Sequence, residues 1–182
     1  MKTLPVTKIG NPVLRKVCEP VPKEKIKDKA LKEFLEVMVA TMHAESGVGL
    51  AANQVGRDLQ AVVLECKDNS RYPDSEDVPL QMYLNPRILA YSEETREDWE
   101  GCLSIPGYRG IVPRSKQVTF EAWTPRGEKV QKTVSGFHAR VIQHEVDHIH
   151  GLFYVDRMPD LKSWMHVDEL GKKLGVKIRE RE

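Results

Sequence analysis

Apolar residues recur with helical spacing over residues 28–43. They fall at i, i+3, i+4, i+7, i+8 and i+11, and they are Leu31, Phe34, Leu35, Met38, Val39 and Met42. This spacing predicts one buried stripe of an amphipathic helix. A Gly-rich turn, SGVGLAANQVG, follows over residues 46–56, and the segment LQAVVLE over residues 59–65 indicates a buried strand.

Two further strands are predicted over residues 83–91 and 117–123, and the second alternates apolar and polar side chains. Residues 129–134 alternate again, and the intervening TPRG at residues 124–127 is typical of a turn. These features together predict a β-hairpin. The polar stretch of residues 67–79, which contains two prolines, is expected to be a loop or insertion because too little chain precedes it to form a separate core.

After Gly136 the apolar spacing becomes helical again, through Val141, Ile142, Val146, Ile149 and Leu152. The pattern predicts a second helix that Gly151 ends. Residues 156–182 are expected to hold one more helix, followed by IRERE as a frayed, solvated tail.

Composition then limits the classes of function. The chain has 182 residues, which favours a single domain over residues 1–182, and 28 Lys and Arg residues nearly balance 27 Asp and Glu residues. Such a balance gives no basis for direct binding to nucleic acid or to an anionic membrane surface. No apolar run approaches the roughly 18 residues that a membrane span needs.

Three widely separated cysteines fit neither a disulfide framework nor a paired zinc motif, so we expect a reducing compartment. Residues 1–18 lack the apolar core of a signal peptide, which favours a cytoplasmic protein. A mature organellar protein whose presequence had been removed would look the same.

The second predicted helix carries the motif HEVDH. His144 and His148, at i and i+4, share one helix face about 6 Å apart along the axis, so both imidazoles can reach one metal ion. Glu145 is placed to reach a water on that metal without being a ligand. Because roughly 0.02 such motifs are expected here by chance, a metal centre is the better interpretation than a helix that happens to carry two histidines.

A third ligand is needed to complete this site. The candidates after the motif are His150, His166, Asp156, Asp160, Asp168 and Glu169, and none has a defensible zincin spacing. The other candidate is Cys102 in WEGCLSIPG. A lone cysteine is usually a small buried hydrophobe, but the flanking Gly101, Ser104 and Pro106 favour a presented thiolate.

Three motifs, GVGLAANQ over residues 47–54, EGCLS over residues 100–104 and QHEVDH over residues 143–148, resemble in that order the three motifs of the peptide deformylase family. KIGNPVLRKVCEPV near the start and GLFYVDRM after the helix also resemble the family, so the likeness covers nearly the whole chain. It implies an α+β fold, with mixed, mainly antiparallel β-sheets packed around a central helix that carries the HExxH motif. GFHARVIQHE is more similar to the organellar branch of the family, with Arg140 where many bacterial members have an aliphatic residue.

The resemblance also implies a site and a reaction. Cys102, His144 and His148 would hold one divalent metal ion, natively Fe²⁺ and replaceable by Zn²⁺, Ni²⁺ or Co²⁺. A water activated on this ion would remove the formyl group from the N-formyl-methionine of newly made polypeptides and release formate. Glu145 would move the proton, while the Gln54 amide and the Leu103 N–H would stabilise the oxyanion.

The substrate peptide is expected to lie extended against backbone at Val48, Gly49 and Gly101, next to Glu100 and Arg109. Its methionine side chain would enter a pocket to which Val48, Phe137 and Val141 contribute. Asp147 is expected to pair with Arg114 behind the metal ligands.

Two other functions share parts of this pattern. A metal-dependent endopeptidase would use the same two histidines and Glu145, and Cys102 discriminates against it. A structural metal site in a binding module would need a fourth protein ligand and no bound water. The resemblance further implies transient association with the ribosome, which nothing in the composition shows independently.

Overall fold

The computed structural model describes residues 2–67 and 75–175, and in this part of the chain most of the strands follow one another between the first and second α-helices. Its α-helices are α1 (Lys29–Ala44), α2 (Gly136–Ile149) and α3 (Val167–Leu174). Its strands are β1 (Gly49–Ala51), β2 (Ala61–Cys66), β3 (Val78–Tyr91), β4 (Thr95–Cys102), β5 (Ile105–Ser115), β6 (Gln117–Trp123), β7 (Lys129–Ser135) and β8 (Met165–His166). Short 3₁₀ helices are η1 (Pro12–Arg15), η2 (Lys23–Lys25), η3 (Ala52–Val55) and η4 (Tyr154–Arg157).

Five strands form the larger sheet, in the order β1-β2-β3-β6-β7, with antiparallel neighbours throughout. The β6–β7 hairpin predicted from the alternation is confirmed, and β6 has the expected bounds. Strand β3 begins at Val78, which pairs with Cys66, so the predicted loop over residues 67–79 was too long at its C-terminal end. β1 and β7 are the two edges of this sheet.

The smaller sheet has the order β4-β5-β8 and is also antiparallel, so β4 is one of its edges. We did not predict β4 and β5 from the sequence. Strand β4 reads TREDWEGC and is largely polar, while β5 contains Pro106, Gly107, Gly110 and Pro113, so neither shows the apolar alternation of a strand. The buried carboxylate of β4, Glu100, has ionic partners in Arg114 and Arg140 instead.

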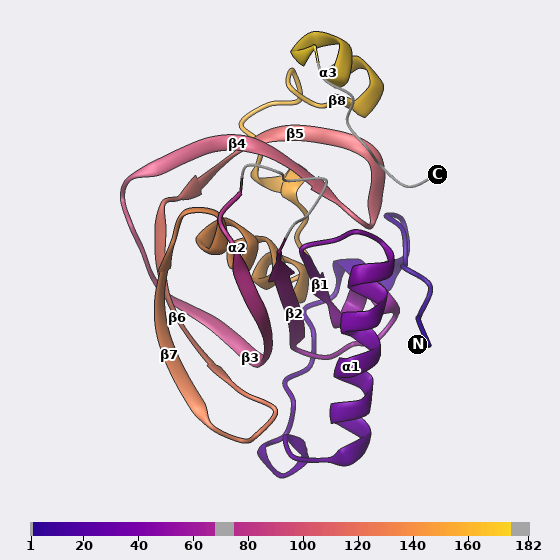
Figure 1. Ribbon diagram of the computed structural model, residues 1–182, viewed down its shortest axis with the longest axis vertical. Helices are drawn as coiled ribbons and strands as arrows, with labels where there is room; N and C mark the ends of the chain where they lie inside the picture. Colours follow the sequence, from indigo (N-terminus) through magenta and orange to yellow (C-terminus); the bar gives the residue numbers. More distant parts are fainter. Residues whose placement is uncertain (1, 68–74, 176–182) are drawn as a thin grey trace.

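Helix α2 lies in the centre of the molecule, against the larger sheet (Figure 1). The apolar face of the helix, including Ile142 and Val146, packs against Val62, Leu64 and Phe120 of the sheet. This placement confirms the expected α+β fold with antiparallel sheets around the HExxH helix. Gly151, at φ +74°, follows the helix in the left-handed conformation typical of a residue after a helix end, as predicted.

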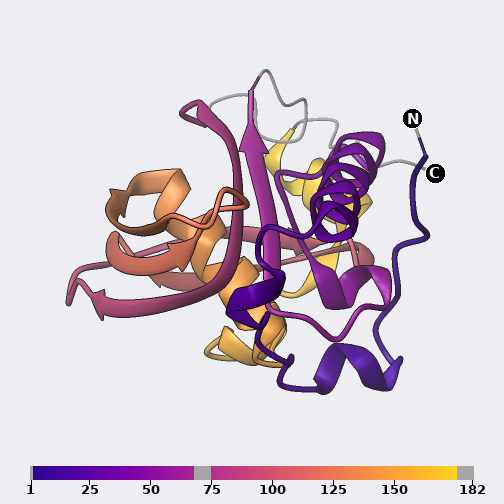
Figure 2. The ribbon, with the colours of Figure 1, turned by 90° about the horizontal axis from the view of Figure 1, so that it is seen from below.

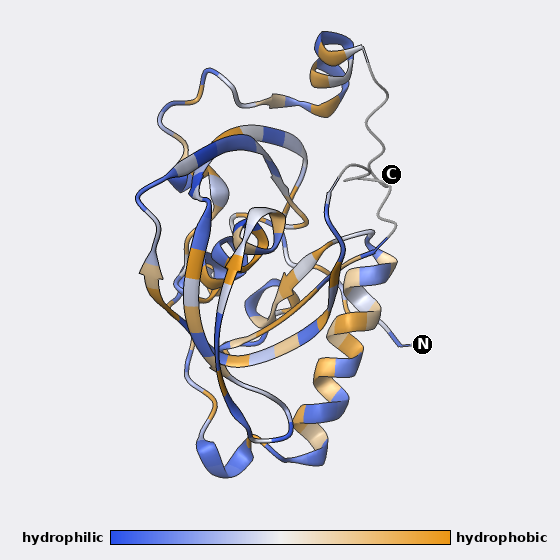
Figure 3. Cartoon of the chain, turned by 60° about the vertical axis from the view of Figure 1, so that its left-hand side comes forward, coloured by the Kyte–Doolittle hydropathy of each residue, from blue (hydrophilic) through white to orange (hydrophobic). Residues whose placement is uncertain are grey.

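Helix α1 covers the opposite face of β2, where Leu35, Met38 and Met42 pack against Ala61 and Val63. Because successive residues of β2 point to opposite faces, burial on both faces explains the continuous apolar run in its sequence. Figure 2 shows β2 between the two helices, and Figure 3 shows the mixed hydrophobic and hydrophilic residues of α1.

The further helix expected within residues 156–182 is α3, whereas the IRERE tail lies outside the described residues. None of the described helices is both long enough and apolar enough to cross a bilayer.

Candidate metal centre

Helix α2 brings two imidazoles together at the centre of the fold. The Nε2 atoms of His144 and His148 lie 3.2 Å apart, and Sγ of Cys102, the last residue of β4, lies 3.2 Å from His148 Nε2. The three ligand atoms all fall within 4.8 Å of one another. Two nitrogen ligands of a tetrahedral zinc ion lie about 3.3 Å apart, given a metal–nitrogen distance of about 2.05 Å. The spacing therefore fits a single metal ion bound by one sulfur and two nitrogen atoms.

The second nitrogen of His144 has a carboxylate partner, because its Nδ1 lies 3.0 Å from Glu100 Oε2. Such a partner fixes the imidazole tautomer and aims the Nε2 lone pair at the metal. Burial opposes charge on His144, but the hydrogen bonds with Cys102 and Glu100 raise its pKa well above the usual value. Burial lowers the pKa of His148 well below the usual value, which favours the neutral imidazole that binds metals.

Both oxygens of Glu100 are occupied. Arg114 donates from Nε to Oε1 and from Nη2 to Oε2, each at 3.0 Å, and Arg140 Nη1 donates to Oε1 at 2.6 Å. Burial alone would raise the pKa of Glu100, but Arg114 and His144 outweigh it and hold the pKa well below its usual range. Glu100 lines the cavity, but its carboxylate is committed to these partners, so we assign it to orienting His144 rather than to binding substrate.

Behind the histidines, Arg114 Nη1 donates to Asp147 Oδ2 at 2.5 Å. The Asp147–Arg114 pair predicted from the sequence is thereby confirmed, and Arg157 contacts the same carboxylate. Arg140 also donates from Nη2 to the Arg96 carbonyl at 2.6 Å, which ties α2 to β4.

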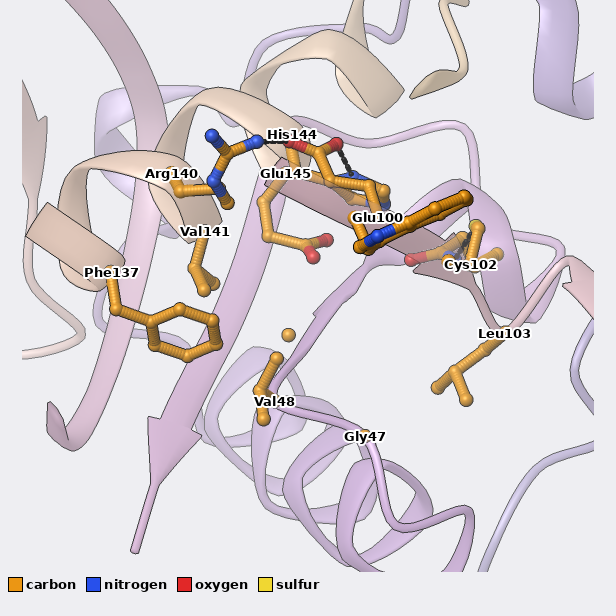
Figure 4. A pocket seen from close by; sticks show the side chains of 14 residues that line it. Gly47, Val48, Glu100, Cys102, Leu103, Phe137, Arg140, Val141, His144 and Glu145 are labelled. Atoms are coloured by element: carbon orange, nitrogen blue, oxygen red, sulfur yellow. Dashed lines mark hydrogen bonds and ion pairs between the residues drawn. The ribbon is translucent and has the colours of Figure 1, made fainter. Parts of the chain in front are cut away.

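Glu145 projects into the cavity beside this cluster (Figure 4). Its side chain is almost fully buried, and Oε2 has no hydrogen-bond partner within the described parts of the chain. Burial raises the pKa of Glu145 to about 7; the charge of His144 lowers this pKa and the charge of Glu100 raises it, both by less than burial does. Gly49 makes room for this carboxylate, because a Cβ atom there would lie 2.2 Å from Glu145 Oε1.

The Gln54 side chain is held in one orientation. Its Oε1 accepts from the Ala51 N–H at 2.8 Å, while its Nε2 donates to Ser104 Oγ at 3.2 Å and to Cys102 Sγ at 3.4 Å. The amide NH₂ group therefore points toward the sulfur. Asn53, one residue earlier, donates from Nδ2 to the His148 carbonyl at 2.6 Å, and this hydrogen bond connects η3 to the last turn of α2.

A cavity with about 510 Å³ of empty space, its mouth included, lies beside the cluster. Its walls come from the start of β1, the end of β4 and the first turns of α2. Most of the site residues expected from the sequence line it, namely Val48, Gly49, Gln54, Glu100, Gly101, Cys102, Leu103, Phe137, Val141, His144 and Glu145. Figure 4 shows Phe137, Val141 and Val48 together on one side of Glu145 and Leu103 on the other.

Two of the expected residues lie elsewhere. His148 is fully buried and is not among the lining residues, and its Nε2 faces Cys102 and His144. Arg109 is 5% exposed, lies opposite Gly101 in the β4–β5 pair and is not among the lining residues, so its contact with substrate stays a prediction. The cluster of the described residues contains Cys102 as its third member, and none of the alternative ligands after the motif joins it.

Sequence reasoning missed several residues at this site. Trp99 and Gly47 line the cavity, and Asn53 and Ser104 orient its ligands. Trp99 stands two residues before Gly101, on the same face of β4, so a correct strand assignment would have found it. Nothing in the sequence indicates the role of Asn53.

A cysteine sulfur, two imidazoles from an HExxH helix and a buried glutamate beside an open cavity are typical of mononuclear metallohydrolases. The family model described as polypeptide deformylase matches residues 3–164. The chain belongs to the polypeptide deformylase family, whose members are metallohydrolases that remove N-terminal formyl groups from nascent peptides.

Individual proteins agree with this assignment. Peptide deformylase 2 of Pseudomonas putida is 41% identical over 171 residues, which cover 94% of this chain and 96% of the relative. Peptide deformylase 1 of Nitrosomonas europaea is 42% identical, with 91% and 93% covered. The structure of a class I type b peptide deformylase from Acinetobacter baumannii with bound Met-Ala-Ser is 38% identical, with a TM-score of 0.84 over 86% of this chain and 98% of that one. These relatives are bacterial, and the resemblance to the organellar branch stays a prediction.

Proposed function

We propose that this chain deformylates N-formyl-methionyl peptides at a single divalent metal ion held by Cys102, His144 and His148. The observation that carries the proposal is the convergence of these three ligand atoms within 4.8 Å, directly beside the buried carboxylate of Glu145. A structural zinc site would require four protein ligands, and the cluster of the described residues offers three.

We propose Fe²⁺ as the native metal, with Zn²⁺, Ni²⁺ or Co²⁺ as replacements. A borderline set of two imidazoles and one thiolate suits all four ions. When bound, such an ion supplies Lewis-acid chemistry, because it lowers the pKa of water and polarises a carbonyl group. Glu100 contributes by holding His144 in the tautomer that leaves Nε2 free to bind the ion.

Glu145 is proposed as the residue that moves the proton. A carboxyl group with a pKa of about 7 can accept a proton from the attacking water and return it to the leaving amine at neutral pH. Its free Oε2 faces a cavity in which nothing else among the described residues competes for that oxygen. The water oxygen would bond to the formyl carbon, the C–N bond would break, and the proton would pass to the departing nitrogen, which gives formate and a free N-terminal amine.

Stabilisation of the oxyanion is assigned to two donors, the Gln54 amide and the Leu103 N–H. Gln54 is held in position through its Oε1, so its NH₂ group does not need to reorganise during the reaction. Leu103 directly follows Cys102, which places its backbone beside the metal ligand.

The peptide is proposed to bind as an extended strand between the free edges of β1 and β4. Both strands are sheet edges, and both line the cavity, at Gly49 and Gly101. Unpaired backbone groups of an edge strand recognise an extended chain without regard to its sequence. The methionine side chain would then lie against Val48, Phe137 and Val141. The bound Met-Ala-Ser in the Acinetobacter baumannii structure supports a peptide ligand of this kind.

We further propose that the protein acts in the cytoplasm, on chains that leave the ribosome, with only transient ribosome contact. The support is the family assignment together with a nearly neutral net charge of +1, which does not favour tight binding to RNA. Co-sedimentation with translating ribosomes at low and high salt tests this part of the proposal.

The decisive experiment measures metal content and formate release on the same samples. Formyl-Met-Ala-Ser is the substrate, with and without chelator, for the unmodified chain, for Glu145→Gln and for the exposed matched control Glu128→Gln. We expect Glu145→Gln to keep one metal ion per chain and to lose about 10²- to 10⁴-fold in kcat, because general acid–base catalysis is removed. Near-normal turnover of this variant, or turnover that resists removal of the metal, would refute the proposal.

A further inference from the structure

Residues 7–9 form a short segment, here called the N-terminal clasp, that touches both segments carrying the proposed oxyanion donors. The Thr7 N–H donates to the Gln54 carbonyl at 2.7 Å, and the Ile9 N–H donates to the Ser104 carbonyl at 2.9 Å. Between them, Lys8 Nζ donates to the Leu103 carbonyl at 2.9 Å. Three consecutive residues thus hold η3 and the turn after β4 from outside the cavity.

The carbonyl that Lys8 contacts belongs to the peptide group joining Leu103 to Ser104. The N–H of that same peptide group is the Ser104 N–H, which donates to Cys102 Sγ at 3.4 Å. A peptide group is a conjugated unit, so positive charge at its oxygen draws electron density from its nitrogen and makes the N–H a stronger donor. One amide therefore connects an exposed ammonium group to the buried sulfur.

Hydrogen bonds to a metal-binding sulfur reduce the electron density that the sulfur donates to the metal. Cys102 Sγ accepts two such bonds, from Ser104 N–H and from Gln54 Nε2. The clasp supports both, since Thr7 fixes the backbone of Gln54 and Lys8 polarises the Ser104 amide.

We propose that Lys8 is a positioning residue of the metal centre, whose ammonium group strengthens the Ser104 N–H···Sγ hydrogen bond of Cys102 through the intervening peptide group. The proposal rests on Cys102 being a metal ligand, as argued above. Lys8 does not line the cavity, so it acts on the metal centre without touching substrate. A metal ion held by Cys102 would be a stronger Lewis acid because of this contact.

The test uses the full chain loaded with Co²⁺, whose thiolate-to-cobalt charge-transfer absorption reports the donor strength of the sulfur. The variants are Lys8→Met, Lys8→Arg and the matched control Lys16→Met. The control removes the same charge from the same N-terminal region, at a lysine that pairs with Asp58 at the surface. Steady-state formate release from formyl-Met-Ala-Ser gives kcat and KM separately.

We expect Lys8→Met to shift the charge-transfer band to longer wavelength and to lower kcat about three- to tenfold with KM unchanged. This loss is smaller than the loss caused by removing a buried hydrogen-bond partner of a metal ligand, because Lys8 is exposed. Lys8→Arg should restore both, and Lys16→Met should change neither. A band at its original position in Lys8→Met, or an equal shift in Lys16→Met, would overturn the proposal. Absence of a thiolate band from the unmodified cobalt protein would instead refute Cys102 as a ligand.

Discussion

Replacing Gly49 with alanine would test how closely turnover depends on the position of the Glu145 carboxylate. A Cβ atom at this residue would lie 2.2 Å from Glu145 Oε1, 2.7 Å from Cδ and 2.9 Å from Cγ. The shortest comfortable carbon–oxygen contact is about 3.3 Å, so the carboxylate must retreat by about 1 Å. Because β1 is held by its pairing with β2, the side chain of Glu145 is expected to move rather than the strand.

A displacement of about 1 Å in a positioned catalytic group lowers turnover by about 10²-fold. We therefore expect Gly49→Ala to lose about 10²-fold in kcat for formyl-Met-Ala-Ser. The metal content should stay at one ion per chain, since Gly49 does not contact the ligand atoms. The loss of stability should be about 1–3 kcal/mol, as for other overpacked sites.

Gly110→Ala is the matched control for overpacking. Its added Cβ would meet Met158 Sδ at 2.5 Å, a clash of similar depth against a flexible side chain outside the cavity. Urea unfolding, metal analysis and formate release on both variants separate the effects. Turnover of Gly49→Ala within twofold of the unmodified chain, or a loss of metal that parallels its loss of activity, would show that the reasoning about Glu145 is wrong.

Three further outcomes follow from the same geometry. Cys102→Ala should lose stoichiometric metal and all formate release, as measured by elemental analysis and enzymatic formate detection; retained metal with peptidase activity would favour the endopeptidase alternative. Arg114→Met should destabilise the fold by about 3–5 kcal/mol in urea unfolding, because it leaves the buried carboxylates of Glu100 and Asp147 without their shared cation, and a change below 1 kcal/mol would contradict this. The Fe²⁺-loaded chain should lose activity in air while the Ni²⁺-loaded chain keeps it, and equal stability of the two would argue against thiolate-bound iron as the working form.

Local periodicity was a good guide wherever an element has one buried face. Helix α1 was predicted over residues 28–43 and spans Lys29–Ala44, and β6 was predicted without error, because side chains on the buried face are apolar in both. It failed for β4, where the buried Glu100 is compensated by Arg114 and Arg140. These partners come from β5 and α2, and no pattern within β4 itself reveals them.

In the candidate site, too, residues placed by local geometry were predictable from the sequence and residues placed by tertiary packing were not. The i, i+4 pair of His144 and His148 follows from helix geometry alone, whereas the residues flanking Cys102 only favoured it as a candidate third ligand and the family resemblance was needed to choose it. Its approach to the histidines depends on how β4 packs beside α2, which is a tertiary property. The contacts of residues 7–9 with Gln54 and with residues 103–104 are of this kind too, since they join segments more than forty residues apart.

Strands β1 and β4 are edges of two different sheets and line the same cavity. In the binding mode proposed above, a peptide would have to supply one extended stretch of main chain to pair with both edges at once, which a helix or a folded surface cannot do. Side chains beyond the first residue would contribute little to such binding. The enzyme would then accept new chains irrespective of their sequence, but only while the N-terminus of each chain is still unfolded.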